Sequence, residues 1–356
     1  VRIMAYTNID DPSAHFQTAV HTSTNAGTIT NDGNSDLQPD LIWSKARGSA
    51  FNHALYDSTR GVTKFLSSNA TSAETTASAG YDLTSFNTDG FSTGNNQFNT
   101  ICGGTTYVAW QWKANGGTTS SNTDGSLTST VQANTTAGFS IVTYSNPSTN
   151  DNTIGHGLGV QPEIIIFKNT VDASNWYVAS KYLSNYTTKY LELDTTDAEQ
   201  THADGMNSTA PTSSVFSVGG ISRTGDQGNL AVAYCFASKQ GYSKFGSYVG
   251  NGNADGSFVY TGFKPAFVML KRTNGAGGWT IYDNKRGYNG NNYELFPNSS
   301  EVEYTGTSYF EADILSNGFK LRLTNSQVNG SGDSYIYMAF AENPFVTSTG
   351  IPTTAR

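Results

Sequence analysis

The chain has 356 residues and a formal net charge of −8, and only 13% of its residues are charged. This length exceeds the size of one ordinary hydrophobic core and fits two or three domains. Phosphate backbones require a clustered basic surface and none is visible, so nucleic acid is not an expected partner. No apolar run reaches the roughly 20 residues that span a bilayer, so membrane insertion is not expected either.

The composition favours strands and turns over helices. Ser, Thr and Asn are abundant, and there are 37 glycines, 20 tyrosines and 19 phenylalanines. This mixture is typical of short strands joined by turn-rich loops, whereas helices are rich in Glu, Lys, Leu and Ala. The two cysteines, Cys102 and Cys235, are too few for a disulfide scaffold or a cysteine-based metal site, and we expect two reduced thiols.

The expected organisation, in chain order, is three units with short connecting segments. The predicted boundaries are an N-terminal arm at 1–14, a first repeat at 15–114, a Gly/Ser/Thr/Asn-rich linker at 115–137, a second repeat at 138–240, a third repeat at 241–346 and a polar C-terminal tail at 347–356. Residues 126–132 of the linker are expected to form one extra edge strand, and residues 1–6 are expected to form a matching strand before the first repeat.

Features that recur at fixed offsets predict three copies of one unit. Each unit starts at an aromatic residue, and 23 residues later a proline begins an apolar strand. Proline suits the first residue of a strand because its missing N–H is not needed there. The aromatic residues are Phe16, Phe139 and Tyr242, and the prolines are Pro39, Pro162 and Pro265.

The last strand of each unit alternates bulky and small side chains. The three strands start at Tyr107, Ala231 and Tyr335. A period of two places alternate side chains on opposite faces of a strand. We expect the bulky face to point into a sandwich core, and the smaller face to lie against a neighbouring layer or solvent. The bulky residues are Val108, Trp110, Trp112, Val232, Tyr234, Phe236, Ile336, Met338 and Phe340.

Two hairpin turns are predicted before these last strands. Asp89-Gly90 in the first unit and Asn317-Gly318 in the third are expected to supply positive φ angles. The second unit has Ser213-Ser214-Val215 there, so its turn must differ. The sequence therefore predicts an all-β chain of three tandem homologous antiparallel β-sandwiches of about 100 residues each. Its periodicity does not distinguish a lectin-like jelly roll from an immunoglobulin-like sandwich.

No catalytic signature is found, and we expect no catalytic residue, cofactor or metal site. The five histidines form no zinc-binding pattern, and Gly155–Gly159 lacks the helix that a phosphate loop needs. Glu192 and Asp194, with Glu294 near the equivalent place in the third unit, are the nearest approach to a glycosidase pair, but a solvated strand face is the favoured explanation. The oxygen-rich segments 31–36 and 251–256 leave calcium open, although ordinary turns have the same composition.

Two tryptophans are the candidate binding residues. Trp176 and Trp279 each lie 14 residues after the proline of their unit, and His53 takes that place in the first unit. Equivalent aromatic residues usually belong to a core, and the alternative is a platform on which sugar rings stack.

Several motifs together resemble a known group of proteins. They are Gln38-Pro39-Asp40, Tyr56-Asp57-Ser-Thr-Arg60-Gly61, Thr84-Ser-Phe-Asn-Thr-Asp-Gly-Phe91, Tyr107-Val-Ala-Trp-Gln-Trp-Lys-Ala114, Ser121-Asn-Thr-Asp-Gly-Ser126, Thr136-Ala-Gly-Phe-Ser-Ile-Val-Thr-Tyr144 and Gly241-Tyr-Ser-Lys-Phe-Gly-Ser-Tyr248. The chain resembles repeat domains in virion proteins of marine bacteriophages over residues 16–346 and the tail. The resemblance implies lectin-like sandwiches in tail-fibre-like or structural proteins, and it carries over no catalytic residue. The second unit departs from the Tyr-Asp-x-x-Arg-Gly pattern.

The expected function is that of a non-enzymatic virion component, such as a tail fibre, appendage or capsid-surface protein, that contributes to host-cell attachment. It would be assembled in the host cytoplasm and located in the virion. Its expected partners are other virion proteins, further copies of itself in a homo-oligomer, and a host surface glycan. The alternatives are an array of carbohydrate-binding modules that serves an upstream domain and, more remotely, a glycan-cleaving enzyme.

Overall fold

A computed structural model describes residues 5–23, 25–147, 152–287, 289, 293–305 and 312–353. Within these residues the structure is built from antiparallel strands, and its helical segments are two short 3-10 turns, η1 (Pro12–Ala14) and η2 (Ser222–Thr224). The prediction of an all-β fold is confirmed. No helix in this part of the chain is long and apolar enough to cross a membrane. Residues 1–4 of the strand expected at 1–6 lie outside the described residues.

Three large sheets dominate the structure, and each comes from one continuous part of the chain. Sheet 1 consists, in spatial order, of β1 (Phe16–Ser23), β9 (Thr105–Trp112), β3 (Leu41–Ala46), β4 (Ala54–Asp57), β5 (Lys64–Leu66) and β6 (Thr75–Thr76). Sheet 2 consists of β10 (Ser120–Asn122), β11 (Ser129–Asn134), β12 (Phe139–Ser145), β19 (Leu230–Phe236), β14 (Ile164–Asn169), β15 (Tyr177–Ser180), β16 (Lys189–Glu192) and β17 (Gln200–Thr201). Sheet 3 consists of β20 (Ser243–Val249), β26 (Ser334–Pro344), β22 (Phe263–Arg272) and β23 (Trp279–Asp283).

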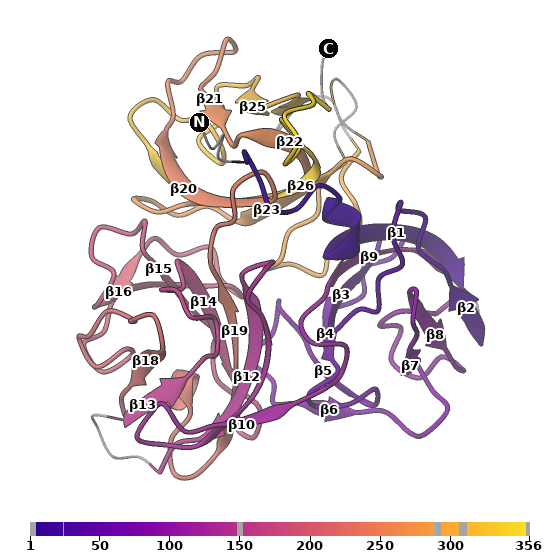
Figure 1. Ribbon diagram of the computed structural model, residues 1–356, viewed down its shortest axis with the longest axis vertical. Coiled ribbons are helices and arrows are strands. Elements are labelled where there is room, and N and C mark those ends of the chain that lie inside the picture. The colour runs from indigo at the N-terminus through magenta and orange to yellow at the C-terminus, as the bar shows by residue number, and fades with distance from the viewer. Residues whose placement is uncertain are drawn as a thin grey trace.

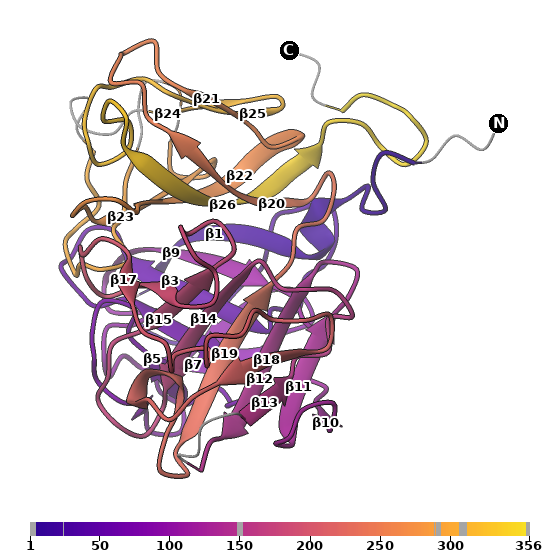
Figure 2. The ribbon, with the colours of Figure 1, turned by 90° about the vertical axis from the view of Figure 1, so that its left-hand side faces the viewer.

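A smaller sheet accompanies each large one. These small sheets are β2 (Gly27–Ile29), β8 (Phe91–Thr93) and β7 (Leu83–Phe86); β13 (Asn152–Gly155) and β18 (Val215–Val218); and β21 (Phe258–Tyr260), β25 (Gly318–Leu321) and β24 (Ala312–Leu315). Figure 1 shows the three large sheets around a common centre, with sheet 3 at the top, sheet 2 at the lower left and sheet 1 at the lower right. Figure 2 shows the same arrangement from the side, with sheet 3 above sheets 1 and 2.

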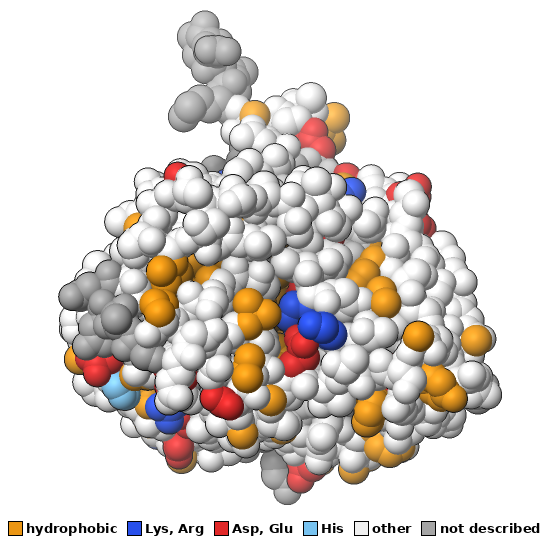
Figure 3. All heavy atoms as spheres, turned by 90° about the horizontal axis from the view of Figure 1, so that it is seen from below, with side chains coloured by type: hydrophobic (Ala, Val, Ile, Leu, Met, Phe, Trp, Pro, Cys, Tyr) orange, Lys and Arg blue, Asp and Glu red, His pale blue; other side chains and the backbone are white. Residues whose placement is uncertain are grey.

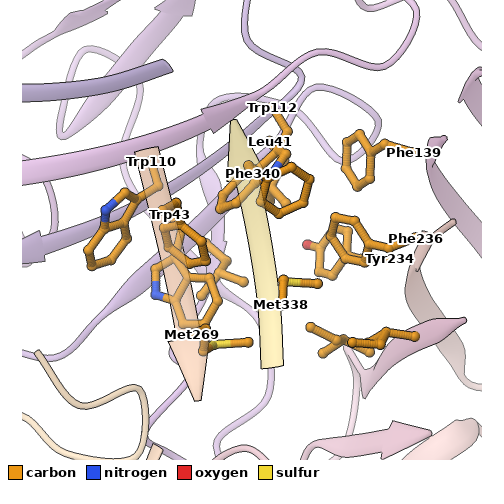
Figure 4. Packing of buried hydrophobic residues seen from close by; sticks show 14 of the residues in the cluster. Leu41, Trp43, Trp110, Trp112, Phe139, Tyr234, Phe236, Met269, Met338 and Phe340 are labelled. Carbon is orange, nitrogen blue, oxygen red and sulfur yellow. The ribbon is translucent and has the colours of Figure 1, made fainter. Parts of the chain in front are cut away.

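The central strands β9, β19 and β26 each separate two cores. Their bulky residues lie in one hydrophobic cluster that all three large sheets share. Their smaller residues, such as Ala109, Ala233 and Ala339, lie in three separate clusters between each large sheet and its small sheet. Side chains from the three sheets converge in the shared core (Figure 4). The predicted alternation is confirmed, but the expectation that the bulky face fills a sandwich core is wrong, because that face fills the core between the sheets.

The strand register corrects one predicted starting point. Phe16 pairs with Trp112 and Phe139 pairs with Phe236, but in sheet 3 the residue opposite Phe340 is Ser243 and not Tyr242. The edge strand expected at 126–132 forms as β11, which pairs with β12. At the other side of each central strand, β3, β14 and β22 are almost entirely buried, as expected. Pro39 and Pro162 precede β3 and β14, but β22 begins at Phe263, so the prediction that a proline begins the strand is wrong for Pro265, where the register with β26 shifts.

The two predicted hairpins form for different reasons. Gly90 has a φ of +89°, and a Cβ there would also lie 2.0 Å from the carbonyl oxygen of Ile29. Gly318 is not among the residues with positive φ, so the predicted reason is wrong for the third unit. A Cβ at Gly318 would lie 2.1 Å from the carbonyl oxygen of Val259 on the neighbouring strand. Gly318 is therefore required because two strands approach closely there, and not because its φ angle is positive.

Candidate functional site

The boundaries between the large sheets contain buried polar contacts that recur from one boundary to the next. We call them seam 1–3, seam 2–1 and seam 3–2, where the first number is the sheet that presents its central-strand residue and the second is the sheet that receives it. These seams contain both tryptophans that the sequence offered for sugar binding.

Trp176 and Trp279 are buried, with 0% and 2% of their surface exposed. The Nε1–H of Trp176 donates to the carbonyl oxygen of Ser67 across seam 2–1, at 2.8 Å. The Nε1–H of Trp279 donates to the carbonyl oxygen of Glu192 across seam 3–2, also at 2.8 Å. A buried ring offers no face to a sugar, so the candidate stacking role is corrected to a core role.

His53 makes the corresponding contact in seam 1–3. Its Nδ1 accepts a hydrogen bond from the indole of Trp43 at 2.9 Å, so its Nε2 carries the proton and donates to the carbonyl oxygen of Phe296 at 3.0 Å. Burial lowers the pKa of His53 well below its usual range, which keeps the ring neutral. The residue 14 positions after the proline thus donates to a main-chain carbonyl of the neighbouring sheet in all three cases. These contacts run from sheet 1 to sheet 3, from sheet 3 to sheet 2 and from sheet 2 to sheet 1, so they follow one rotational sense around the shared core.

Main-chain hydrogen bonds repeat in the same sense. In each seam the N–H of a glutamate donates to the carbonyl oxygen of the residue eight positions after the strand-initial proline. The pairs are Glu303 to Arg47 at 2.8 Å, Glu74 to Thr170 at 2.9 Å and Glu199 to Thr273 at 2.8 Å. The glutamate at this place was not singled out in the sequence.

A buried lysine ends the proline-led strand of each sheet. Lys168 Nζ donates to the carbonyl of Thr71 in sheet 1 at 2.9 Å, and Lys271 Nζ donates to that of Asp197 in sheet 2 at 2.7 Å. Lys45 Nζ donates to the carbonyl of Ala46 in its own sheet at 2.7 Å. All three side chains are 0% exposed, and burial lowers the pKa of each to about 8. Their recurrence six residues after each proline is the signal that could have predicted them.

Two seams contain a buried ion pair that receives a side chain from the next sheet. In seam 2–1, Arg60 pairs with Asp57 at 2.6 Å, and the hydroxyl of Tyr234 donates to Asp57 at 2.8 Å. In seam 1–3, the same pairing joins Arg286 and Asp283 at 2.5 Å. There the indole of Trp110 donates to Asp283 at 2.9 Å, and the Arg286 guanidinium lies 5.4 Å from the centre of the Trp110 ring.

Among the described residues, seam 3–2 has no such ion pair, and no side chain from the central strand of sheet 3 donates a hydrogen bond there. The central strand of sheet 3 presents Met338, which lines a small apolar cavity together with Ile164 and Val178 of sheet 2. The positions that carry Asp and Arg in the other sheets are Ser180 and Leu183. The second unit therefore departs from the Tyr-Asp-x-x-Arg-Gly pattern where its partner is Met338, an apolar side chain that needs no hydrogen bond.

The carboxylates considered for catalysis hold neighbouring chain segments. Glu192 pairs with Arg223 at 2.7 Å, and Asp194 accepts hydrogen bonds from the main chain of Trp176 and the amide of Asn175, both at 3.0 Å. Burial raises the pKa of both carboxyl groups. The main chain of Glu294 forms a bridge with Tyr304.

The described residues contain no cluster of three or more His, Cys, Asp and Glu side chains that could hold a metal ion. In the segment considered for calcium, Asn251 and Asn253 each accept a main-chain N–H two residues further on, as turn residues do. In the other segment, Asp32 pairs with Lys285 of sheet 3 at 2.8 Å. Cys102 and Cys235 are free and buried, as expected.

Two surface hollows lie beside β1, the outermost strand of sheet 1. One of about 300 Å³ is lined by Thr18, Asp32, Asn284 and Lys285 among others, where sheet 1 meets sheet 3. The other, of about 420 Å³, follows residues 20–23 and reaches β2.

Comparison with protein families gives a match that spans residues 11–344. The chain belongs to the family described as Domain of unknown function (DUF7483). The matched residues include all three large sheets. No significant match was found among curated proteins or among solved structures.

Proposed function

We propose that the chain is a non-enzymatic structural component of a bacteriophage virion, acting as a tail fibre, appendage or capsid-surface protein that contributes to host-cell attachment. The observation that carries the proposal is the repeated set of seam contacts. Such contacts hold three sheets in one fixed arrangement, which suits a part that bears load and presents loops. The proposed location is the virion, after assembly in the host cytoplasm.

We further infer that 15–114, 138–240 and 241–346 are copies of one jelly-roll or lectin-like sandwich of about 100 residues. Its support is positional. The same offset from the strand-initial proline gives the lysine that binds carbonyl groups and the aromatic or histidine ring that crosses each seam. Copies that close on each other around a shared core would explain why each contact recurs in one rotational sense.

The surface is suited to weak and repeated contacts. Figure 3 shows one face on which backbone atoms and uncharged polar side chains cover most of the surface, hydrophobic side chains form several separate patches, and basic and acidic groups touch near the middle. Several weak contacts on linked modules raise avidity without a strong single site. Proposed partners are other virion proteins, further copies of this chain and a host glycan. The alternative of a sugar-binding module array has lost Trp176 and Trp279 as stacking residues.

The test is to look for the chain in particles. Virions of a phage that encodes it would be purified by density gradient and digested for mass spectrometry. We expect peptides from all three proposed copies in amounts that follow the major structural proteins through the gradient. A phage-encoded replication protein provides the matched control, because it should stay in the lysate. Peptides that stay in the lysate with this control would reject the proposal.

A further inference from the structure

Sheets 1 and 2 differ in what covers their equivalent edge strands. β1 pairs with β9 as β12 pairs with β19, beginning with Phe16 opposite Trp112 and Phe139 opposite Phe236. In sheet 2, β11 then pairs with β12 and places Gln132 opposite Ile141. In sheet 1, β1 is the last strand and has no such neighbour among the described residues.

The segment 120–134 closes the whole side of the second sandwich. Besides the β11–β12 ladder, Leu127 forms a parallel bridge with Ile154 of the small sheet. Ser126 and Thr153 exchange two hydrogen bonds of 2.8 Å. Main-chain pairing to both layers therefore covers the opening between the large sheet and its small sheet.

The same side of the first sandwich is open. The hollow of about 300 Å³ follows the start of β1 where sheet 1 meets sheet 3, and the hollow of about 420 Å³ follows its end and reaches β2; β1 and β2 correspond to β12 and β13. Val20 in the middle of β1 is 40% exposed. Thr18, which is 5% exposed and lines the first hollow, has a buried hydroxyl without a hydrogen-bond partner among the described residues.

The main chain of β1 presents free groups to these hollows. The N–H of Lys113 donates to the carbonyl of His15 at 3.0 Å. Alternation in an antiparallel ladder then directs the main-chain groups of 15, 17, 19 and 21 toward β9, and those of 16, 18, 20 and 22 outward. In sheet 2 the equivalent outward groups belong to residues such as Ile141, which pair with β11.

The wall of the first hollow opposite β1 also corresponds to a surface that contacts β11 in sheet 2. The amide of Gln132 on β11 donates to the hydroxyls of Ser58 and Thr59, at 2.9 and 2.8 Å across seam 2–1. The corresponding turn residues of sheet 3 are Asn284 and Lys285, and they line the first hollow. Lys285 pairs there with Asp32, but both side chains are largely exposed, and such a pair contributes little and can open.

We propose that the free edge of β1 accepts an extended segment of another polypeptide as an added antiparallel strand, as β12 accepts β11. The occupant we assign is an uncharged Ser/Thr-rich segment with apolar or amide side chains at alternate positions, as in Ser126–Asn134. An uncharged strand suits a hollow whose acidic lining residues are already paired, Asp32 with Lys285 and Glu342 with Lys264. The assignment goes beyond the proposed function and holds wherever the chain is located.

The probe is a labelled synthetic peptide with the sequence of residues 120–134, titrated into the full chain. We expect saturable binding and slower amide hydrogen exchange at Thr18, Val20 and Thr22 when the peptide is bound. Val20→Pro removes one outward N–H and should weaken binding by about tenfold or more, because one edge hydrogen bond is lost and the ring obstructs its neighbours. Val20→Ala keeps the N–H and is the matched control, with a change of less than about threefold.

Each other outcome overturns the assignment. Unchanged binding by Val20→Pro, or no saturable binding to the natural chain, would reject strand addition at β1. If the bound peptide slows amide exchange on β12 or β20 and not on β1, the binding site is on those strands and the assignment to β1 is wrong. A chain that sediments as a dimer with β1 already protected would identify a second copy as the occupant. If Val20→Pro loses the melting transition of the natural chain, exchange on the natural chain with a Gln132→Pro peptide decides the question, because that peptide lacks the matching N–H.

Discussion

Each central-strand side chain that crosses a seam matches the residues it meets in its ability to donate a hydrogen bond. Tyr234 and Trp110 each bring one polar hydrogen to a buried aspartate, whereas Met338 brings none. A buried carboxylate without its partners costs several kcal/mol, so an ion pair opposite methionine would be destabilising. The residue on each central strand therefore matches the residues that it meets in the next sheet. An Asp–Arg pair is present in the two sheets that meet Tyr234 or Trp110, and it is replaced in the sheet that meets Met338.

The Tyr234 hydroxyl provides a direct measure of one such match. Tyr234→Phe removes the donor to Asp57 and leaves the ring in place, and we expect a loss of about 1.5–3 kcal/mol in the free energy of unfolding, as for hydrogen bonds to charged groups. Tyr144→Phe is the matched control, because its buried hydroxyl donates to the neutral carbonyl of Thr224 at 2.7 Å. That change should cost about 1 kcal/mol. Equal losses in urea denaturation would contradict the role given to the ion pair.

The three buried lysines make stability depend on pH above neutrality. Burial lowers the pKa of Lys45, Lys168 and Lys271 to about 8 from a value of 10.5 in the unfolded chain. Between these values the unfolded chain binds more protons than the folded one, so the free energy of unfolding rises with pH. Each lysine adds at most about 1.4 kcal/mol per pH unit.

Denaturation at pH 7.5, 8.5 and 9.5 measures this effect. We expect the urea midpoint to increase across the series and to increase less in Lys168→Met, which keeps the stem and removes the charge. Above about pH 10 the trend should reverse, because burial raises the pKa of Tyr234 and Tyr144 well above that value and the folded chain then holds the extra protons. A midpoint that falls between pH 8.5 and 9.5 in the natural chain would contradict the assignment.

At the scale of the strand, close approach determines where glycine is needed. Gly318→Ala places a methyl group 2.1 Å from the carbonyl oxygen of Val259, so β21 and β25 must separate, and we expect a loss of about 1–3 kcal/mol. Gly27→Ala on β2 is the matched control, because nothing lies within 4 Å of its added Cβ. That change should be neutral or slightly stabilising. Thermal denaturation of the two variants makes the comparison, and similar melting temperatures would contradict it.

Strand positions could be predicted from the sequence because they depend on local chemistry. The prolines before β3 and β14, the alternation in 107–112 and the turn at Gly90 each follow from two or three neighbouring residues. The Asn-Gly pair at 317–318 has the same local pattern, but its glycine serves a contact with β21 that is distant in sequence. The local sequence pattern therefore predicts that a turn is present, but it does not predict why the turn needs a glycine.

The seams could not be predicted, because their partners lie far apart in the chain. Asp57 and Tyr234 are separated by 177 residues, and no spacing connects them. Alternation along a strand shows that its two faces differ, but both faces of β9 are buried, so it does not indicate which core is shared. For the same reason the repeated tryptophans are explained only by the carbonyl groups they reach in the next sheet.

At the scale of the whole molecule, the shared core makes the three sheets depend on one another. All five tryptophans lie in it, and none is more than 3% exposed. Sheet 1 contributes Trp43, Trp110 and Trp112, whose rings would be exposed in water if that sheet stood alone. Asp10 also accepts a hydrogen bond of 2.6 Å from the main chain of Ser348, which joins the two ends of the described chain beside sheet 3.

We therefore expect the chain to unfold in a single cooperative transition. Tryptophan fluorescence reports the shared core, and far-ultraviolet circular dichroism reports the strands of all sheets, so the two urea curves should coincide. A fragment of residues 15–114 should show red-shifted fluorescence and no cooperative transition, because its large apolar face has lost its cover. Glu303→Gln, which weakens the ion pairs with Arg47 and Arg286 in one seam, should lower the midpoint of both curves equally. Separate transitions for the two probes, or a fragment that unfolds cooperatively with buried tryptophans, would show that the sheets fold independently.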